Sequence, residues 1–257
     1  MAITNTMRTK MQKGEKVIGA FSNLGCTAAI ECLGLAGLDF VIIDTEHGTS
    51  DVESVLPMIL AAERWNITPL VRVKDASRSS ILKMLDIGAM GLVVPFIKTI
   101  DEVKQIVEYG KYAPLGQRGF GQARKSGFAT FPESSGPVDF FEACNRETLL
   151  IPQCETAEAL GCIEEITALE GVDGIFLGPF DLSIAMGIPV QFDHPEFVAA
   201  VEKTVQACKT AGKFCITLGV NSSATQANFA RGFDGVATSD ISFLLGGAQQ
   251  YLKDCKA

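Results

Sequence analysis

The sequence predicts an α/β protein of the (β/α)₈ TIM-barrel class, for three reasons. Short apolar segments rich in strand-forming residues recur eight times, and amphipathic segments with helical spacing lie between them. Because strands and helices alternate, the sheet is expected to be parallel, and eight such units close most simply into a barrel. The first predicted strand is not followed by a GxGxxG motif, which removes the main sign of a Rossmann domain.

The predicted elements follow this alternation in order. The eight strands are expected at residues 17–21, 40–44, 69–73, 91–96, 149–155, 174–179, 214–219 and 235–240. The clearest helical stretches are residues 52–65, 101–112, 157–169 and 195–212. One long connection, residues 95–149, interrupts the pattern with a helix, a Gly-rich loop and a second short helix around Val138–Cys144. Connections of this length are usually functional lids, contact arms or disordered segments.

The composition favours one well-packed domain that acts on small molecules. Of the 257 residues, 47% are hydrophobic and 20% are charged, so the chain can bury a large core, and we expect residues 1–257 to form one domain. The net charge of −8 argues against nucleic acid as a partner. The sequence shows neither a signal-peptide pattern nor an apolar run of the ~20 residues that span a bilayer, so we expect a cytoplasmic protein without membrane association.

Polar residues interrupt or end the predicted strands at one end. Chemistry in this class of barrel takes place at the carboxyl ends of the strands, where side chains distant in sequence converge. Charged groups at the end of a buried strand are energetically unfavourable unless they are paired or used. The residues in question are Asp44, Glu46, His47, Arg72, Gln153, Glu155 and Asp181.

Glu155 and Asp181 are the predicted metal ligands. They lie 26 residues apart, about one βα unit, so their carboxylates are expected on adjacent strands. Two oxygen ligands, with water and substrate completing the shell, suit Mg²⁺ or Mn²⁺, with Co²⁺ as an alternative. Zinc is disfavoured because nothing supplies its preferred His and Cys ligands. The structural alternative makes Glu155 a salt-bridge partner and Asp181 a helix N-cap; the neighbouring polar strand ends favour the metal.

His47, Asp44 and Arg72 are the candidate catalytic residues. His47 has an ordinary pKa near ~6.5, which suits proton transfer, although a lone histidine is more often structural. Asp44 is expected to accept a hydrogen bond from one ring nitrogen of His47 and to orient the other toward substrate. Arg72 is expected either to bridge the strand-end carboxylates or to bind a carboxylate or developing oxyanion.

Two other reactive residues are assigned structural roles. Strand alternation turns Cys154 away from the face that Gln153 and Glu155 share, so we expect it to pack in the core. His194 precedes a proline at a predicted helix start and is expected to be a loop residue.

The sequence resembles the metal-dependent (class II) pyruvate aldolases of the HpcH/HpaI aldolase family. This family includes 4-hydroxy-2-oxoheptane-1,7-dioate aldolase and 2-dehydro-3-deoxyglucarate aldolase. The likeness runs from about Val17 to Asp240 and depends on an ordered set of motifs, because DxEH alone would be a weak signal. The motifs are DTEHG, PLVRV, MLDIGAMGLVVPF, PLGQRGFG, LLIPQCET and GVDGIFLGPFDLSIAMG. The resemblance implies a barrel of the phosphoenolpyruvate/pyruvate superfamily type, commonly a homohexamer with C-terminal helices exchanged between subunits.

The resemblance also implies roles for individual residues. Glu155 and Asp181 match the family's metal ligands, and Asp44 and His47 match its acid/base dyad. Arg72 matches its pyruvate-binding arginine, and Asp86 matches an aspartate that reaches the site of a neighbouring subunit. The residues implied to contact substrate, in addition to Arg72, are Gln153, Gly178, Pro179, Phe180 and Leu218.

The implied reaction is reversible cleavage of a 4-hydroxy-2-oxo acid to pyruvate and an aldehyde. Phe180, and QARKSGF after RGFG, depart from the family pattern and are expected to border the aldehyde half of the substrate. One alternative is a carbon–carbon lyase for acyl-CoA thioesters, which would need a basic patch for the CoA phosphates; the nearest candidates are Arg118, Arg124 and Lys125. Another is a non-catalytic binding barrel.

Overall fold

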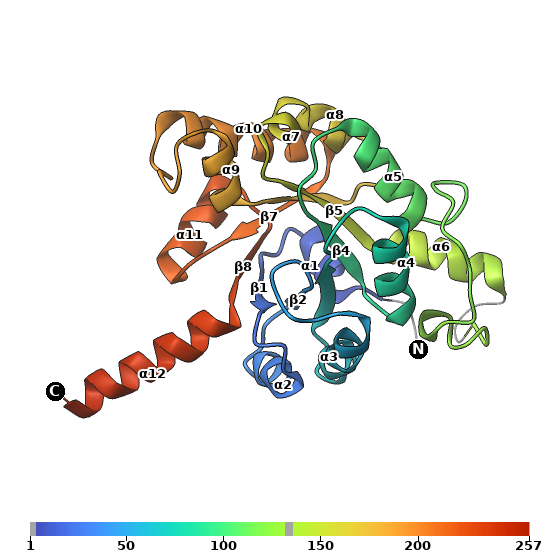
Figure 1. Ribbon diagram of the computed structural model, residues 1–257, viewed down its shortest axis with the longest axis horizontal. Coiled ribbons are helices and arrows are strands. Elements are labelled where there is room, and N and C mark those ends of the chain that lie inside the picture. The colour runs from blue at the N-terminus through green and yellow to red at the C-terminus, as the bar shows by residue number, and fades with distance from the viewer. Residues whose placement is uncertain (1–3, 132–135, 257) are drawn as a thin grey trace.

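The computed structural model describes residues 4–131 and 136–256 and forms a closed barrel of eight parallel strands (Figure 1). Each strand pairs with its sequence neighbours, and β1 pairs with β8 to close the ring. The predicted (β/α)₈ class is therefore confirmed. The strands are β1 Val17–Ser22, β2 Phe40–Asp44, β3 Thr68–Arg72, β4 Gly91–Val94, β5 Leu149–Cys154, β6 Gly174–Leu177, β7 Phe214–Leu218 and β8 Gly235–Ser239.

Helices connect the strands around the outside of the barrel. In chain order they are α1 Thr6–Gln12, α2 Thr27–Leu35, α3 Val52–Arg64, α4 Arg78–Ile87, α5 Ile100–Gly110, the 3₁₀ turn η1 Arg124–Ser126, α6 Pro137–Glu147, α7 Ala157–Gly161, α8 Ile163–Ala168, α9 Pro179–Ala185, α10 Pro195–Ala211, α11 Ser222–Arg231 and α12 Asp240–Lys256.

Some predicted elements differ in extent from those in the structure. The stretch 157–169 forms two short helices that are separated at Cys162, not one. The predicted sixth strand ends early, because Gly178 caps α9 and Pro179 occupies its first turn. The second helix of the long connection is longer than expected and spans Pro137–Glu147; residues 132–135 of the Gly-rich loop lie outside the described residues.

The core consists of two apolar layers. One lies between the sheet and its surrounding helices and includes Cys154, whose burial confirms its predicted core position. The other fills the barrel interior and includes Ile42, Leu70 and Phe176. Strands buried on both faces explain why the predicted strands are continuous apolar runs.

The short helix α1 covers the amino end of the barrel. Its Met7 and Met11 are buried within the interior layer. The preceding Asn5 is fully buried, and its side-chain amide donates to the carbonyl groups of Met90 and Glu147 at 3.2 and 3.0 Å. The barrel is thus closed at its amino end and presents its polar strand ends at the other.

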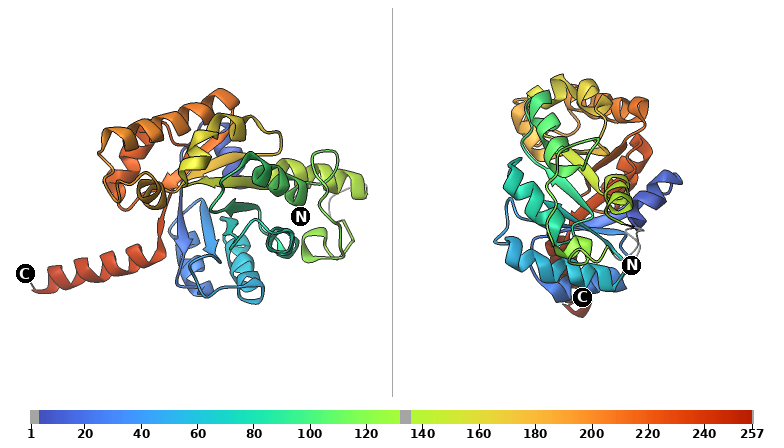
Figure 2. Two further views of the ribbon diagram at one scale, coloured as in Figure 1. Left: turned by 45° about the horizontal axis from the view of Figure 1, so that its top comes forward. Right: turned by 90° about the vertical axis from the view of Figure 1, so that its right-hand side faces the viewer.

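The C-terminal helix α12 extends away from the barrel (Figures 1 and 2). Of its described residues only Asp240, at the start of the helix, is buried. Phe243, Leu244 and Tyr251 are 47%, 60% and 70% exposed. Within the described chain, no helix is both long enough and apolar enough to cross a membrane.

Candidate active site

Asp44 and Arg72 form a buried ion pair at the carboxyl ends of β2 and β3, where they are register partners. Arg72 Nε donates to Asp44 Oδ1 at 2.9 Å, and Nη2 donates to Oδ2 at 2.7 Å. Arg72 Nη1 lies 3.0 Å from Glu46 Oε2. Because a guanidinium has five N–H groups, one donor on each terminal nitrogen stays available for a substrate oxygen.

The pKa values of these groups indicate that the pair stays charged. Burial would raise the pKa of Asp44, but the hydrogen bonds and charge of Arg72 hold it below its ordinary value. Burial would lower the pKa of Arg72, yet the bonds with Asp44 raise it. Asp44 therefore fixes the position of a permanently cationic Arg72.

His47 lies at the rim, and its side chain is 67% exposed. Its backbone N–H approaches Asp44 Oδ1 at 3.5 Å, whereas its Nε2 lies 3.8 Å from Glu46 Oε2. Across the described residues, no hydrogen bond joins the Asp44 carboxylate to the His47 ring, so the expected contact is corrected to one with Glu46. The reason is that the Asp44 oxygens already accept from Arg72, from the Asn23 amide and from the backbone N–H groups that follow β2.

The sequence places Glu46 at the strand end but does not predict its contacts with Arg72 and His47. Its carboxylate lies between Arg72 and His47 and is largely buried. Burial raises its pKa, against the attraction of the Arg72 and His47 charges. Its place in the DTEHG motif was visible in the sequence, but only the structure shows which partners it contacts.

Glu155 is a buried carboxylate directly after β5. Its Oε1 accepts the N–H of Phe96 at 2.6 Å, and its Oε2 accepts the amide of Gln153. Burial raises the pKa of Glu155 to about 7, repulsion from Glu46 and Asp181 adds to this shift, and the Phe96 N–H opposes it. Excess negative charge thus surrounds Glu155, and a bound cation would offset it.

The residues present fit a divalent metal held by two carboxylates. Within residues 4–131 and 136–256, no group of three or more His, Cys, Asp and Glu side chains could hold a metal ion. Asp181 is exposed in the first turn of α9 and repels Glu155 electrostatically. The side-chain oxygen of Gln153 is buried without a hydrogen-bond partner. Such a donor set is all oxygen, which suits Mg²⁺ or Mn²⁺.

Gly178 leaves room beside Glu155 and Gln153. A Cβ at this position would lie 2.8 Å from Glu155 Oε2 and 2.9 Å from Gln153 Nε2. Any side chain here would therefore displace the Glu155 or Gln153 side chain.

Most predicted site residues line one cavity of about 220 Å³ at the barrel mouth. They come from the ends of β3 and β5, from α9 and from the end of β7. The predicted residues in this lining are Arg72, Gln153, Gly178, Pro179, Phe180, Asp181 and Leu218.

Sequence reasoning missed four residues of the same lining, Phe21, Asn23, Phe176 and Ser239. Asn23 follows β1 and donates to Asp44 Oδ2 at 3.1 Å, and Ser239 ends β8 and bonds Asn23. The strand-end rule that identified the other polar residues would also have found these two.

Asp86 and the proposed basic patch lie elsewhere. Asp86 is near the C-terminal end of α4 and pairs with Arg118 at 2.8 Å, so it does not join the cavity of its own barrel. Arg124 pairs with Glu63, and the Lys125 ammonium contacts Met90 Sδ. These cations are engaged in internal contacts and do not form the free patch that CoA phosphates would need.

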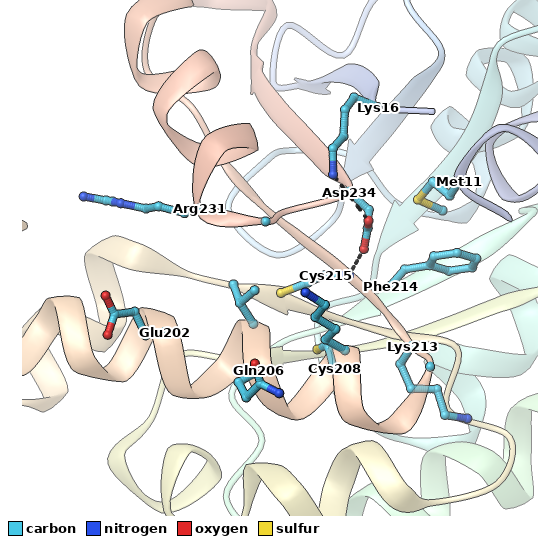
Figure 3. Close-up of a pocket in the computed structure, with 14 residues that line it drawn as sticks. Met11, Lys16, Glu202, Gln206, Cys208, Lys213, Phe214, Cys215, Arg231 and Asp234 are labelled. Carbon is cyan, nitrogen blue, oxygen red and sulfur yellow. Dashed lines mark hydrogen bonds and ion pairs between the residues drawn. The ribbon is translucent and has the colours of Figure 1, made fainter. Parts of the chain in front are cut away.

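A larger cavity, of about 560 Å³, lies at the amino end of the barrel between α10, β7 and the start of β8 (Figure 3). Lys16 reaches toward Asp234, with Nζ 3.7 Å from Oδ1. Arg231 and Lys213 extend away from one another in Figure 3. Because these charged groups diverge, the mouth cavity is the better candidate for an active site.

The fold and the mouth cavity define a barrel enzyme with its polar groups at the carboxyl ends of the strands. The sequence matches the HpcH/HpaI aldolase/citrate lyase family over residues 17–239, and the chain belongs to this family. It is therefore a carbon–carbon lyase.

Similar proteins match along almost their whole length. The pyruvate aldolase of Rhizobium etli is 35% identical, with 91% of this chain and 96% of the relative covered. The hydroxypyruvate/pyruvate aldolase of Roseobacter denitrificans is 33% identical, with coverages of 94% and 93%. The structure of an HpcH/HpaI aldolase/citrate lyase family protein from Burkholderia cenocepacia is 28% identical and superposes with a TM-score of 0.91, covering 99% of this chain and all of that one.

Proposed function

We propose that this protein catalyses reversible aldol cleavage of a 4-hydroxy-2-oxo acid to pyruvate and an aldehyde, with a divalent metal ion. The observation that carries the proposal is the convergence of Arg72, Gln153 and Asp181 on one cavity beside the buried Glu155. The names of two similar relatives, a pyruvate aldolase and a hydroxypyruvate/pyruvate aldolase, support the same substrate class.

Arg72 and His47 would divide the chemistry between them. Cleavage removes the proton of the C4 hydroxyl, breaks the C3–C4 bond and moves an electron pair toward the C2 carbonyl. The free donors of Arg72 would stabilise the negative charge that develops on the pyruvate oxygens. His47 would accept the hydroxyl proton, and the nearby Glu46 carboxylate would stabilise the resulting imidazolium.

Glu155 and Asp181 would hold the metal ion, and Mg²⁺, Mn²⁺ and Co²⁺ all accept such oxygen ligands. When bound, the ion would supply Lewis-acid stabilisation of the developing enolate. Gln153 and the main chain from Gly178 to Asp181 would orient the pyruvate carboxylate.

Assembly into a homo-oligomer, most simply a hexamer, would complete the site and cover α12. Exchange of α12 between subunits would bury its apolar residues, which are exposed in a single chain. Asp86 would then act at the site of a neighbouring subunit, since it lies outside its own mouth cavity.

The test is an enzyme-coupled assay for pyruvate release from a panel of 4-hydroxy-2-oxo acids. Pyruvate is expected from at least one acid when Mg²⁺ or Mn²⁺ is present, and its release should fall at least tenfold after chelation. Absence of pyruvate from every acid at saturating metal would contradict the proposal, and undiminished release after chelation would contradict its metal requirement.

A further inference from the structure

A second cavity, also of about 220 Å³, adjoins the mouth cavity. It lies among α9, α10, α11 and the end of β7, and most of its lining residues are not part of the mouth cavity. Pro179, Phe180 and Leu218 line both cavities and form the boundary between them.

The two cavities differ in chemical character. Arg72, Gln153 and Asp181 make the mouth polar, whereas the second cavity is lined mainly by apolar and aromatic side chains. Two polar side chains in its lining already form hydrogen bonds within the protein. Thr217 Oγ1 and Asn228 Nδ2 donate to main-chain carbonyl groups at 2.9 and 3.1 Å. The exposed Asp193 and Arg231 complete the lining.

A series of aromatic rings leads from the mouth into this cavity. Phe180, which is 37% exposed, meets Phe192 edge to face with 5.2 Å between the ring centres. Phe192 in turn contacts Phe197 at 5.4 Å, and Phe197 is only 2% exposed. The contacts provide a continuous apolar surface from the rim to the core.

We propose that this apolar cavity is the subsite for the substituent on C4, so that the preferred aldehydes carry an apolar chain. The inference rests on the proposed aldol reaction, in which C3 of pyruvate bonds to the aldehyde carbon without any further reactant. Either cavity alone is smaller than the roughly 300–1,000 Å³ typical of small-molecule sites, whereas the two together fall within this range. A polar oxo-acid head with an apolar tail matches their combined chemistry.

The test compares kcat/KM for condensation of pyruvate with hexanal and with acetaldehyde, using the metal-loaded full chain. The wild type is expected to favour hexanal by at least tenfold, because each methylene buried in an apolar pocket raises specificity severalfold or more. Ala224→Phe and Ala227→Phe would fill the cavity from α11, and each should reduce the hexanal-to-acetaldehyde ratio at least fivefold.

Ala230→Phe is the matched control, because Ala230 is exposed on the same helix and outside the lining. It should leave the ratio unchanged. Since Ala227 is exposed, Ala227→Phe decides the matter if Ala224→Phe does not fold. A wild-type ratio near one, or an equal change in the control, overturns this inference while aldol turnover persists. No condensation with either aldehyde overturns the proposed function and the inference with it.

Discussion

At the scale of single residues, the site separates a buried, fixed cation from an exposed histidine. Arg72 is held by two hydrogen bonds to Asp44 and by Glu46, whereas the His47 side chain is exposed and its ring lies near the Glu46 carboxylate. A fixed donor suits stabilisation of an enolate, and a rim histidine suits removal of the proton from the C4 hydroxyl oxygen.

This division predicts different losses for two substitutions. His47→Ala should reduce aldol cleavage at least 100-fold yet leave exchange of the pyruvate C3 protons with solvent within a few-fold, because the enolate is still stabilised. Arg72→Ala should impair both reactions. Deuterium incorporation by NMR, run beside the cleavage assay, measures the two steps. Normal cleavage by His47→Ala would make the histidine structural, and equal losses of exchange and cleavage would assign it to the enolate step.

Lys125 is a contrasting case, because none of the acidic side chains in residues 4–131 and 136–256 forms a hydrogen bond with its amine. Its amine contacts Met90 Sδ, and burial lowers its pKa to about 8. Because the folded-state pKa lies below the ordinary value of 10.5, the protonated amine destabilises the fold below about pH 8, and this penalty disappears as the pH rises to 10.5. The titratable groups that influence this pKa are Cys144, Arg118, Glu63 and Arg124.

Lys125→Met is therefore expected to stabilise the protein. The gain in the free energy of unfolding should be about 1–3 kcal/mol at pH 7 and should vanish near pH 10.5, since both chains then bury a neutral side chain. Urea unfolding at the two pH values measures it. The exposed Lys83→Met serves as control; a gain that does not depend on pH would refute the titration argument.

At the scale of secondary-structure elements, the junction of β6 with α9 positions Asp181, one of the two proposed metal ligands. The strand ends at Leu177, Gly178 caps the helix, and Asp181 follows in its first turn. Gly178 is thus constrained by its neighbours' side chains and not by its backbone angle, since its φ is −89°.

Gly178→Ala should weaken Mn²⁺ binding at least tenfold in calorimetry and lower cleavage to a similar degree, because the new Cβ displaces Glu155 and Gln153. Gly161→Ala is the control, as a Cβ there meets no atom within 4 Å. Unchanged affinity in Gly178→Ala would remove Glu155 from the metal site.

The sequence was sufficient to predict the strands and the strand-end residues, but not how the side chains pair. Doubly buried strands leave continuous apolar runs, and polar residues such as Asp44 and Arg72 stand out at their ends. The contact of His47 with Glu46, not Asp44, depends on the strand register that turns Arg72 onto Asp44, and side-chain partners of this kind have no periodic signal. Likewise, the apolar cavity beside Phe180 is lined by three successive helices, α9, α10 and α11, and how their side chains pack has no periodic signal.

At the scale of the whole molecule, α12 is the feature that supports the proposed homo-oligomer. Its apolar residues are exposed over a helix of 17 residues, and Figure 2 shows it projecting away from the barrel. Replacing Leu244, Leu245 and Leu252 together by Ser should dissociate the assembly, because it removes apolar surface that a partner would cover.

Light scattering at micromolar concentration measures the assembly, with Gln249→Ser and Gln250→Ser on the same helix as the control. The wild type is expected to be a homo-oligomer and the triple variant to be smaller. A monomeric wild type with full activity would contradict an exchanged α12.

Because α1 closes the amino end of the barrel, it also affects the order in which the two products can leave the site. Met7 and Met11 fill that end, so substrate and products reach or leave the buried Arg72 and Gln153 through the mouth of the barrel, past Phe180. A pyruvate held at depth cannot depart while the aldehyde still occupies the passage above it, so cleavage should be a sequential process in which the aldehyde is released first. Product inhibition can test this: pyruvate should compete with the hydroxy-oxo acid, whereas the aldehyde should inhibit noncompetitively, and the reverse pattern would require another exit.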